Sequence, residues 1–208
     1  MTWPSARVLV GAAVGVVIVA LLGLGAWLWA DARDRRAAAA YAEPLARLAA
    51  ARGASASSPE ARAAVARDLE AALAQHPSAS IAAQAALELG NLRYEERDYV
   101  RARSAWEVAV ARAASPTVRT LARAGVGDTW EAEGHPGKAA EAYQAALALL
   151  RPADFYYEEL LLALGRAQEL SGNRDAAVET YRRLVRERPR SPRTDDVRAR
   201  LAALGAGP

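Results

Sequence analysis

The 208-residue sequence contains no cysteine, two histidines, one methionine and one phenylalanine. Without cysteine the chain can form neither a disulfide nor a thiolate metal site. His76 and His135 each precede a proline, which is typical of a turn, and neither lies near an acid-and-nucleophile pattern. The sequence therefore predicts no enzymatic activity, no metal site and no cofactor.

A strongly basic surface is also missing. The formal net charge is +3, and the basic stripe with interleaved aromatic residues that is typical of nucleic-acid binders is absent. The segment GHPGK at 134–138 lacks the serine or threonine of a phosphate-binding loop and follows no strand. We therefore expect neither a nucleic-acid partner nor a small-molecule substrate. One basic cluster is either a solvated end of the domain or a contact for anionic lipid or an acidic partner; it contains Arg182, Arg183, Arg186, Arg188, Arg190 and Arg193.

Charged residues are absent from one long run, residues 8–30. As a helix this run extends about 34 Å, which exceeds the ~30 Å hydrocarbon core of a bilayer. Trp27 and Trp29 lie near its end, where indole rings favour the membrane interface. The alternative is a signal peptide cleaved near Ala30-Asp31-Ala32, but signal sequences have apolar runs of only about 7–15 residues. The sequence predicts a transmembrane helix over 8–30, in contact with the lipid bilayer, after a short N-terminal tail over 1–7.

The rest of the chain is rich in alanine and arginine and is punctuated by glycine and proline, which argues for an all-α fold. Residues 31–58 are expected to form a juxtamembrane helix and a loop. Ser58-Pro59-Glu60 is a typical helix start, with a capping serine and proline at the first position. That helix is expected to end near residue 76, and further helices are predicted at 80–96, 99–113, 117–133, 137–150, 154–170, 174–188 and 193–204.

A fixed spacing of small and aromatic residues organises the chain after residue 80. Gly90, Ala102 and Trp106 each return twice, at steps of 37 and 38 residues. The recurrences are Gly127 and Gly165, Ala139 and Ala177, and Tyr143 and Tyr181. Each unit contains two amphipathic helices, so the period indicates a helical solenoid whose units bury their apolar faces against one another. We expect Trp106, Tyr143 and Tyr181 to lie in the core.

This pattern resembles the tetratricopeptide repeat (TPR), whose units carry a Leu-Gly pair, a turn glycine, an alanine, an aromatic residue and a proline. The third unit matches with Leu164-Gly165, Gly172, Ala177, Tyr181 and Pro189, and the second with Gly127, Trp130, Gly134, Ala139, Tyr143 and Ala146-Leu147. The first unit departs at Arg97, which replaces the turn glycine, and at Arg93, which replaces an aromatic residue. A degenerate unit lies upstream, marked by Leu69, Ala72, Leu73 and Pro77. The resemblance implies TPR-like repeats over 59–190, followed by a C-terminal capping helix and tail over 191–208.

In TPR proteins the first helix of each pair lines a concave groove that holds a partner peptide or helix. The resemblance places this groove on Gln84, Leu87, Asn91, Tyr94 and Glu95, on Leu121, Asp128 and Glu131, and on Glu159, Leu162, Arg166 and Glu169. Of these, Tyr94, Asn91 and Arg166 are expected to contact a partner while contributing little to the fold. Only Asn91 agrees with the carboxylate clamp of one TPR subclass, so that mode of binding is not expected. The alternative is that these residues form an ordinary solvent-facing helix surface.

A short tail, one span, an alanine-rich helix and a TPR domain, in this order, resemble the YfgM-like family of ancillary Sec translocon subunits. The resemblance implies a scaffold of the bacterial cell envelope, held in the inner membrane by one span, whose periplasmic domain contacts translocon and chaperone partners. Two other interpretations stay open: an anchored adaptor of another envelope assembly, such as division or outer-membrane biogenesis, and an adaptor that faces the cytoplasm.

The charges beside the span conflict with a periplasmic domain. Arg33, Arg35 and Arg36 follow the span, whereas only Arg7 and the amino terminus precede it. The positive-inside rule would therefore place the large domain in the cytoplasm. Long domains nevertheless translocate largely regardless of their charge. We follow the family resemblance and expect the TPR domain in the periplasm.

Overall fold

The computed structural model describes residues 6–53 and 58–207, with side chains from 15 to 51 and from 58 to 207. Within these ranges the chain forms nine helices and no strand, which confirms the predicted all-α class. In chain order they are α1 (Ala6–Gly53), α2 (Pro59–Gln75), α3 (Ala82–Glu95), α4 (Tyr99–Arg112), α5 (Pro116–Ala132), α6 (Pro136–Leu147), α7 (Tyr157–Leu170), α8 (Arg174–Glu187) and α9 (Thr194–Ala203). Residues 1–5 of the predicted tail and 54–57 of the predicted loop lie outside the described ranges.

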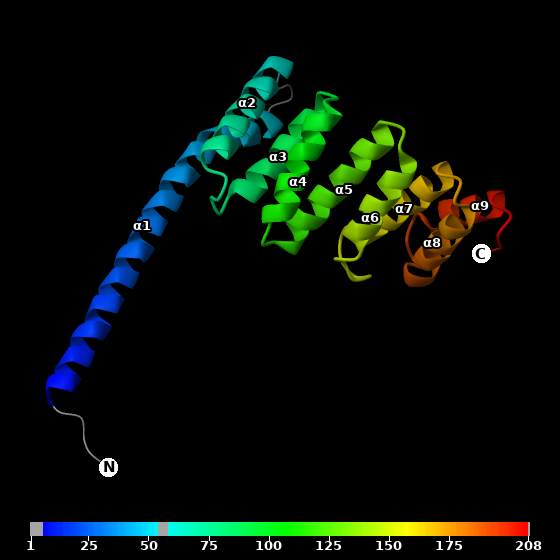
Figure 1. Ribbon diagram of the computed structural model, residues 1–208. Helices are drawn as coiled ribbons and strands as arrows, with labels where there is room; N and C mark the ends of the chain where they lie inside the picture. Colours follow the sequence, from blue (N-terminus) through cyan, green and yellow to red (C-terminus); the bar gives the residue numbers. More distant parts are fainter. Residues whose placement is uncertain (1–5, 54–57, 208) are drawn as a thin grey trace, which may run out of the picture.

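The helices stack as antiparallel pairs into an elongated domain, from which α1 projects (Figure 1). The pairs are α3 with α4, α5 with α6, and α7 with α8, and α9 closes the stack against α8. Each second helix also packs against the first helix of the next pair. Apolar faces that one pair cannot cover are therefore buried between neighbours. This is the TPR-like solenoid that the sequence period predicts.

Local chemistry sets where some of these helices begin. The hydroxyl groups of Ser58 and Ser115 cap α2 and α5, and proline fills the first position of both helices. The start of α7 differs from the prediction, because this helix begins at Tyr157 rather than near residue 154. The carboxylate of Asp154 instead accepts a hydrogen bond from the backbone amide of Arg151 at 2.8 Å and closes a turn there.

The longest helix, α1, joins the apolar segment to the domain without a break. Every large apolar side chain between residues 16 and 29 is exposed. Further along, Tyr41 is fully buried, and its hydroxyl donates to the carbonyl oxygens of Ala72 (3.1 Å) and His76 (2.8 Å). The C-terminal part of α1 is thus the first helix of the degenerate upstream unit, with α2 as the second. The core therefore reaches upstream of residue 59, where the repeats were predicted to begin.

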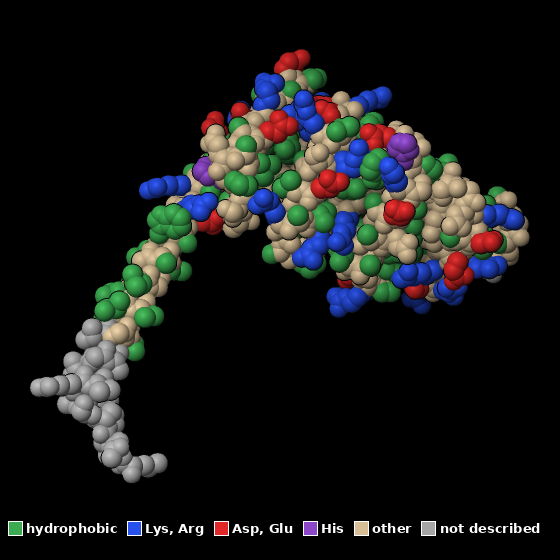
Figure 2. Space-filling model, viewed as in Figure 1, with side chains coloured by type: hydrophobic (Ala, Val, Ile, Leu, Met, Phe, Trp, Pro, Cys, Tyr) green, Lys and Arg blue, Asp and Glu red, His purple; other side chains and the backbone are tan. Residues whose placement is uncertain are grey.

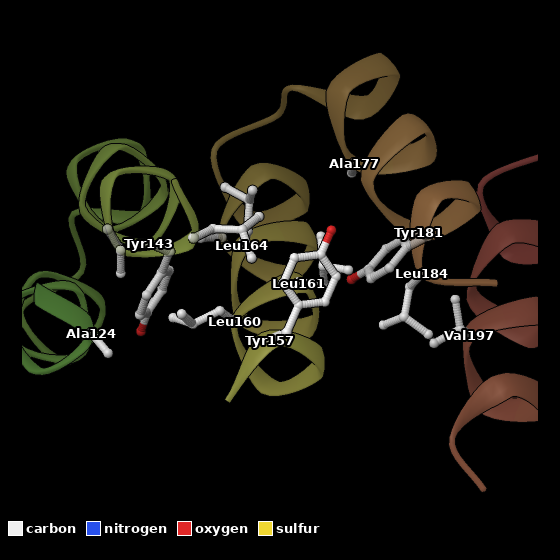
Figure 3. Packing of buried hydrophobic residues seen from close by; sticks show 14 of the residues in the cluster. Ala124, Tyr143, Tyr157, Leu160, Leu161, Leu164, Ala177, Tyr181, Leu184 and Val197 are labelled. Atoms are coloured by element: carbon white, nitrogen blue, oxygen red, sulfur yellow. The ribbon is translucent and has the colours of Figure 1, made fainter. Parts of the chain in front are cut away.

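The aromatic residues of the repeat pattern lie in the core, as predicted. Trp106, Tyr143 and Tyr181 are 4%, 1% and 1% exposed. Figure 3 shows the ring of Tyr143, which comes from α6, lying between Ala124 of α5 and Leu160 of α7. Each ring therefore joins its own pair to the pair beside it, which is how the stack holds together.

Glycine makes room for these rings. Each of these pairs has a glycine sixteen residues before its core aromatic residue. A methyl group added at that glycine would lie less than 3.0 Å from the aromatic ring. The three combinations are Gly90 with Trp106, Gly127 with Tyr143, and Gly165 with Tyr181. Trp106 also meets Gly125 of the following pair in the same way. The indole is therefore held between two glycine surfaces, one from each neighbouring pair.

Each of the three described turns within pairs places one residue in the left-handed region. Arg97, Gly134 and Gly172 have φ angles of 61°, 76° and 78°. In all three turns the amide of this residue and the amide of the next residue bond back to carbonyl oxygens of the preceding helix, as in a Schellman motif. Arg97 therefore adopts a conformation that favours glycine, as the sequence comparison between units indicated.

Arg93, the other departure of the first unit, is a buried cation. It is 6% exposed, and its guanidinium donates to Glu70 of α2 at 3.0 Å and to Glu96 at 2.7 Å. An ion pair between α2 and α3 thus takes the place of the aromatic packing that the family pattern has there. Because both carboxylates compensate the buried charge, the guanidinium is tolerated at this site.

Candidate functional site

The first helices of successive pairs lie next to one another on one face of the stack. α3 contacts α5, and Arg166 of α7 donates two hydrogen bonds to the carboxylate of Glu131 of α5, at 2.7 and 3.0 Å. Arg200 extends this face onto α9, since its guanidinium donates to Glu169 of α7 at 3.2 Å. We call the surface of α3, α5, α7 and α9 on this side the inner face. It carries the polar residues that the sequence predicts for a groove.

The centre of the inner face is a connected polar chain. The hydroxyl of Tyr143, whose ring is in the core, donates to Asp128 at 2.7 Å and lies 3.0 Å from the carboxylate of Glu131. Glu131 in turn accepts from Arg166 of the next pair. Three predicted site residues, Asp128, Glu131 and Arg166, are therefore brought together, and the buried tyrosine fixes their positions.

A similar contact occurs on the inner face at each end of this polar chain. The hydroxyl of Tyr181 donates to Glu169 at 2.6 Å, and Glu169 also accepts from Arg200. In the α3–α4 pair the indole N–H of Trp106 lies 3.3 Å from the amide oxygen of Asn91. Each core aromatic thus presents its polar atom to a predicted site residue on the inner face. This pairing of core and surface was not predicted from the sequence.

Three predicted site residues are placed differently from the expectation. The ring of Tyr94 is half-buried and packs against Tyr99 and Trp106, with ring centroids 5.4 and 5.7 Å apart. The expectation that Tyr94 contributes little to the fold is therefore wrong. Leu87 is 6% exposed and belongs to the core around Trp106, so it does not line an open surface. Glu95 is exposed and pairs with Arg62 of α2 at 3.6 Å, outside the polar chain.

The remaining predicted groove residues are spread along the inner-face helices. Gln84 donates to Glu88 at 3.2 Å, and Asn91 donates to the same carboxylate at 3.2 Å. Leu121 is exposed, whereas Glu159 and Leu162 are half-buried. Glu88 therefore belongs to the site although the sequence analysis did not name it. Its position four residues after Gln84 and three before Asn91, on one helix face, was the available signal.

Burial sets the protonation behaviour of the polar chain. Desolvation raises the pKa of the Asp128 carboxyl, and the nearby charge of Glu131 raises it further, while the Tyr143 hydroxyl and Arg166 oppose the rise. Desolvation, together with Asp128, also raises the pKa of Tyr143 far above its ordinary value. The pKa of the Arg166 guanidinium is raised mainly by its hydrogen bonds to Glu131. At neutral pH Tyr143 thus keeps its proton and donates a hydrogen bond to Asp128, and Arg166 stays charged.

A cavity of about 520 Å³ lies at the C-terminal end of the inner face, between α7 and α9. Apolar side chains of Leu162 and Val197 form part of its wall. Three guanidinium groups, from Arg166, Arg193 and Arg200, also line it, and Asp196 is the one acid among the lining residues. Only Leu162 and Arg166 of this set were predicted as groove residues. The α9 residues were missed because the sequence pattern assigned that helix a capping role alone.

Metal chemistry has no candidate site in the part of the chain that the structure describes. No group of three or more histidine or acidic side chains there is arranged to hold an ion. His76 and His135 lie in turns, and the ring of His135 packs edge-on against Trp130 at 5.7 Å. The acids of the inner face are instead paired with tyrosine and arginine.

Comparison with known proteins agrees with this description. A family model described as a tetratricopeptide repeat-like domain matches residues 3–126. A search among curated proteins gave no significant match. The solved structure of PilF from Pseudomonas aeruginosa is similar with a TM-score of 0.54 at 18% identity, over 84% of this chain and 86% of that chain. BtubC (BKLC) from P. vanneervenii gives a TM-score of 0.46 at 21% identity, over 70% of this chain and 63% of that one. At 18% identity the likeness to PilF shows the fold alone.

Proposed function

The chain belongs to the tetratricopeptide repeat-like family, and from this premise we propose that it is a membrane-anchored, non-catalytic scaffold of the bacterial cell envelope that holds a protein partner on its inner face. The domain is of the TPR protein-interaction type. The observation that carries the proposal is the inner face itself. There, core aromatics and ion pairs fix Asp128, Glu131, Arg166 and Glu169 in place, next to the cavity between α7 and α9. A surface that is fixed before binding loses less conformational entropy when a partner docks.

Anchoring is supported by the first half of α1. One helix in the described ranges is long and apolar enough to cross a membrane. Its apolar side chains between residues 16 and 29 are exposed, and none of them is needed to cover the domain. The matched family model also includes this segment. We therefore assign residues 8–30 to the inner membrane as a single span.

The cavity at the end of the inner face suggests the chemistry of the partner. Leu162 and Ala199 offer apolar contact, while Arg193 and Arg200 add positive charge beside them. A partner segment that combines an apolar side chain with an acidic one would satisfy both. We therefore assign the cavity to an acidic and apolar segment of another protein.

The identity of the partner is inferred from the order of parts in the chain. A short tail, one span and a TPR domain resemble the YfgM-like subunits, which supports association with the Sec translocon and periplasmic chaperones. The alternative partners are an assembly for division or outer-membrane biogenesis, or a cytoplasmic complex if the domain faces inward. Partner recovery distinguishes these alternatives.

Site-specific photo-crosslinking in cells tests the proposal. A photoreactive residue at Leu162, in the cavity, should form an adduct with a partner protein. The adduct should be lost in the double variant Arg193→Glu/Arg200→Glu. The same photoreactive residue at Glu141, which is exposed on the second helix α6, is the control and should give no adduct.

The identity of the crosslinked protein decides between the alternatives. Translocon subunits in the Leu162 adduct would support Sec association, whereas division or outer-membrane proteins would favour the other envelope assemblies. Equal adducts from both positions, or none from Leu162, would overturn the inner face as the binding site. Turnover of a substrate by the purified protein without any partner would contradict the non-catalytic assignment.

A further inference from the structure

The loops of the solenoid separate onto two opposite edges. The connections between pairs, at 76–81, 113–115, 148–156 and 188–193, lie on one edge, and the turns within pairs lie on the other (Figure 1). Because α1 is the first helix of its pair, its N-terminal extension leaves the domain from the edge of the between-pair loops. We call this edge the loop edge. If residues 8–30 span a membrane, the loop edge faces that membrane.

A direct contact holds the loop edge close to the end of the proposed span. Asp34, four residues after that span, accepts hydrogen bonds from the backbone amide of Ser80 (3.0 Å) and from its hydroxyl (2.9 Å). These bonds lower the pKa of the Asp34 carboxyl, which keeps it ionised and paired at neutral pH. The loop at 76–81 is thus fixed beside α1 within one helical turn of the apolar segment.

The most exposed apolar ring of the domain lies on the same edge. Phe155, the only phenylalanine of the chain, is 92% exposed in the loop between α6 and α7. The two residues that follow it, Tyr156 and Tyr157, are half-buried and fully buried. The fold therefore turns two consecutive aromatic rings inward and leaves the third, Phe155, pointing away from the core.

The two edges also differ in charge. The between-pair loops carry four arginines and one aspartate, whereas the three described within-pair turns carry three acids and one arginine. Arg151 and Arg190 are exposed on the loop edge, and Figure 2 shows basic side chains along the lower border of the domain, with acidic side chains among them. Arg188 donates to the carbonyl oxygen of Asp154 at 3.4 Å, which joins the last two loops into one surface.

We propose that the loop edge is a second membrane-contact site, at which Phe155 inserts into the headgroup region while Arg151 and Arg190 bind anionic lipid headgroups. An exposed aromatic ring next to basic side chains is suited to this interface, because the ring favours the apolar boundary and the guanidinium groups attract anionic lipid. This inference rests on the anchoring part of the proposed function. Contact at both α1 and Phe155 holds the long axis of the solenoid parallel to the bilayer. The inner face is then directed along the membrane and stays open to a partner.

Lipid-based quenching on the full-length protein tests this site. Because the chain has no cysteine, Ala153→Cys on the loop edge and Ser171→Cys on the opposite edge each give one labelling position; both residues are exposed. The fluorescently labelled protein is placed in nanodiscs that contain a headgroup-linked nitroxide lipid. We expect the label at 153 to be quenched several-fold more than the label at 171, and more in discs with phosphatidylglycerol than in discs of phosphatidylcholine alone.

Two substitutions of exposed apolar residues separate insertion from simple proximity. Phe155→Ser should reduce the quenching of the label at 153 toward the level at 171. Leu170→Ser, which removes a 62% exposed side chain near the opposite edge, is the matched control and should leave that quenching unchanged. Circular dichroism of each variant checks that the fold is kept.

The outcomes distinguish this inference from the proposed function. Equal quenching at both positions, or no effect of Phe155→Ser, would overturn the contact of the loop edge with lipid while leaving the scaffold proposal intact. A protein that fails to co-elute with the nanodiscs would overturn the anchoring itself. A Phe155-dependent crosslink to another protein, without quenching in protein-free discs, would assign the ring to a protein contact and reject the lipid site.

Discussion

At the level of single residues, the close approach of glycine and aromatic side chains fixes how tightly each pair of helices packs. A ring of the size of Tyr143 fits against α5 only because the facing position has no Cβ. The same ring then carries its hydroxyl to Asp128 on the inner face. One residue therefore contributes both to the core and to the position of a candidate binding residue.

Two glycine substitutions should have opposite effects. Gly127→Ala places a methyl group within 3.0 Å of Tyr143 and should lower the free energy of unfolding by about 1–3 kcal/mol. Gly137→Ala, on the exposed first turn of α6 where nothing lies within 4 Å of the new carbon, should raise it by roughly 0.4–1 kcal/mol. Urea unfolding followed by circular dichroism measures both. A Gly127→Ala protein as stable as the parent would contradict the proposed packing.

Arg97 allows a second comparison between equivalent positions. Its φ of 61° lies in the left-handed region, which costs a residue with a side chain about 1–2 kcal/mol. Arg97→Gly should therefore stabilise the protein by about 1 kcal/mol, after allowance for the greater freedom of glycine in the unfolded chain. Gly134→Ala, at the same place in the next turn, should destabilise it by a similar amount. Thermal unfolding of the two variants should shift in opposite directions, and shifts of the same sign would refute the argument.

Asp128 should make stability depend on pH in an unusual direction. Folding raises the pKa of its carboxyl above 3.8, mainly by burial. A raised pKa means that its stabilising contribution is full below pH 3.8 and is lost as pH rises through the folded value. At pH 7 the ionised group therefore weakens the fold. Asp128→Asn, which keeps an acceptor for the Tyr143 hydroxyl, should raise the free energy of unfolding at pH 7 and gain less at pH 4. If the substitution instead lowers the free energy of unfolding at pH 7, and lowers it more there than at pH 4, ionised Asp128 supports the fold.

At the level of helices, α1 has two roles that meet near residue 34. Its large apolar side chains between residues 16 and 29 are exposed, and its second half buries Ala37, Tyr41 and Leu48 against α2 and its neighbours. Pro44 lies inside this second half without ending the helix. The apolar segment and the degenerate upstream unit are therefore joined by one continuous helix rather than by a loop.

A fragment that begins at residue 59, the boundary predicted from the sequence, should show that the domain depends on α1. A fragment of residues 59–208 lacks Tyr41 and leaves apolar side chains of α2 and α3 uncovered, whereas residues 31–208 keep them covered. Removing one large buried aromatic side chain costs about 3–5 kcal/mol, so the shorter fragment should unfold at much lower urea concentration. Hydrogen exchange should show the loss in α2 and α3, with α7 and α8 still protected, because solenoid units contact only their neighbours. Equal unfolding midpoints would mean that α1 is dispensable to the domain.

At the level of the whole molecule, the continuous helix α1 relates the direction of the proposed span to the direction of the inner face. The Asp34–Ser80 contact and the buried Tyr41 hold α1 against the domain. If residues 8–30 span a membrane as proposed, the side on which the domain lies decides which partners can reach the inner face.

Protease treatment of spheroplasts should establish that side. We expect protease added outside an intact inner membrane to digest the domain, as a periplasmic location requires. The arginine-rich flank at 33–36 opposes this orientation by the positive-inside rule. Survival of the domain until the membrane is lysed would assign it to the cytoplasm and leave the cytoplasmic adaptor as the explanation.

The fold class, the repeat period and the buried aromatics could all be predicted from the sequence. Small and aromatic residues recur at fixed steps, and only stacked helix pairs bury such a pattern. The sequence also indicated that Arg97 occupies a glycine position, because the equivalent residues in the other units are glycines. These features are local or periodic, so they can be recognised along the chain without knowledge of contacts.

The contacts among the predicted site residues could not be predicted in this way and became visible in the folded structure. It joined Tyr143 to Asp128 and Arg166 to Glu131 through side chains from different helices, and it moved Leu87 into the core. It also showed that an alanine-rich stretch around Tyr41 completes the degenerate upstream unit, although no glycine and aromatic residue lie sixteen positions apart within that unit. Contacts of this kind depend on the angle and register at which helices pack, and that geometry is set by all the pairs together rather than by any one segment of sequence.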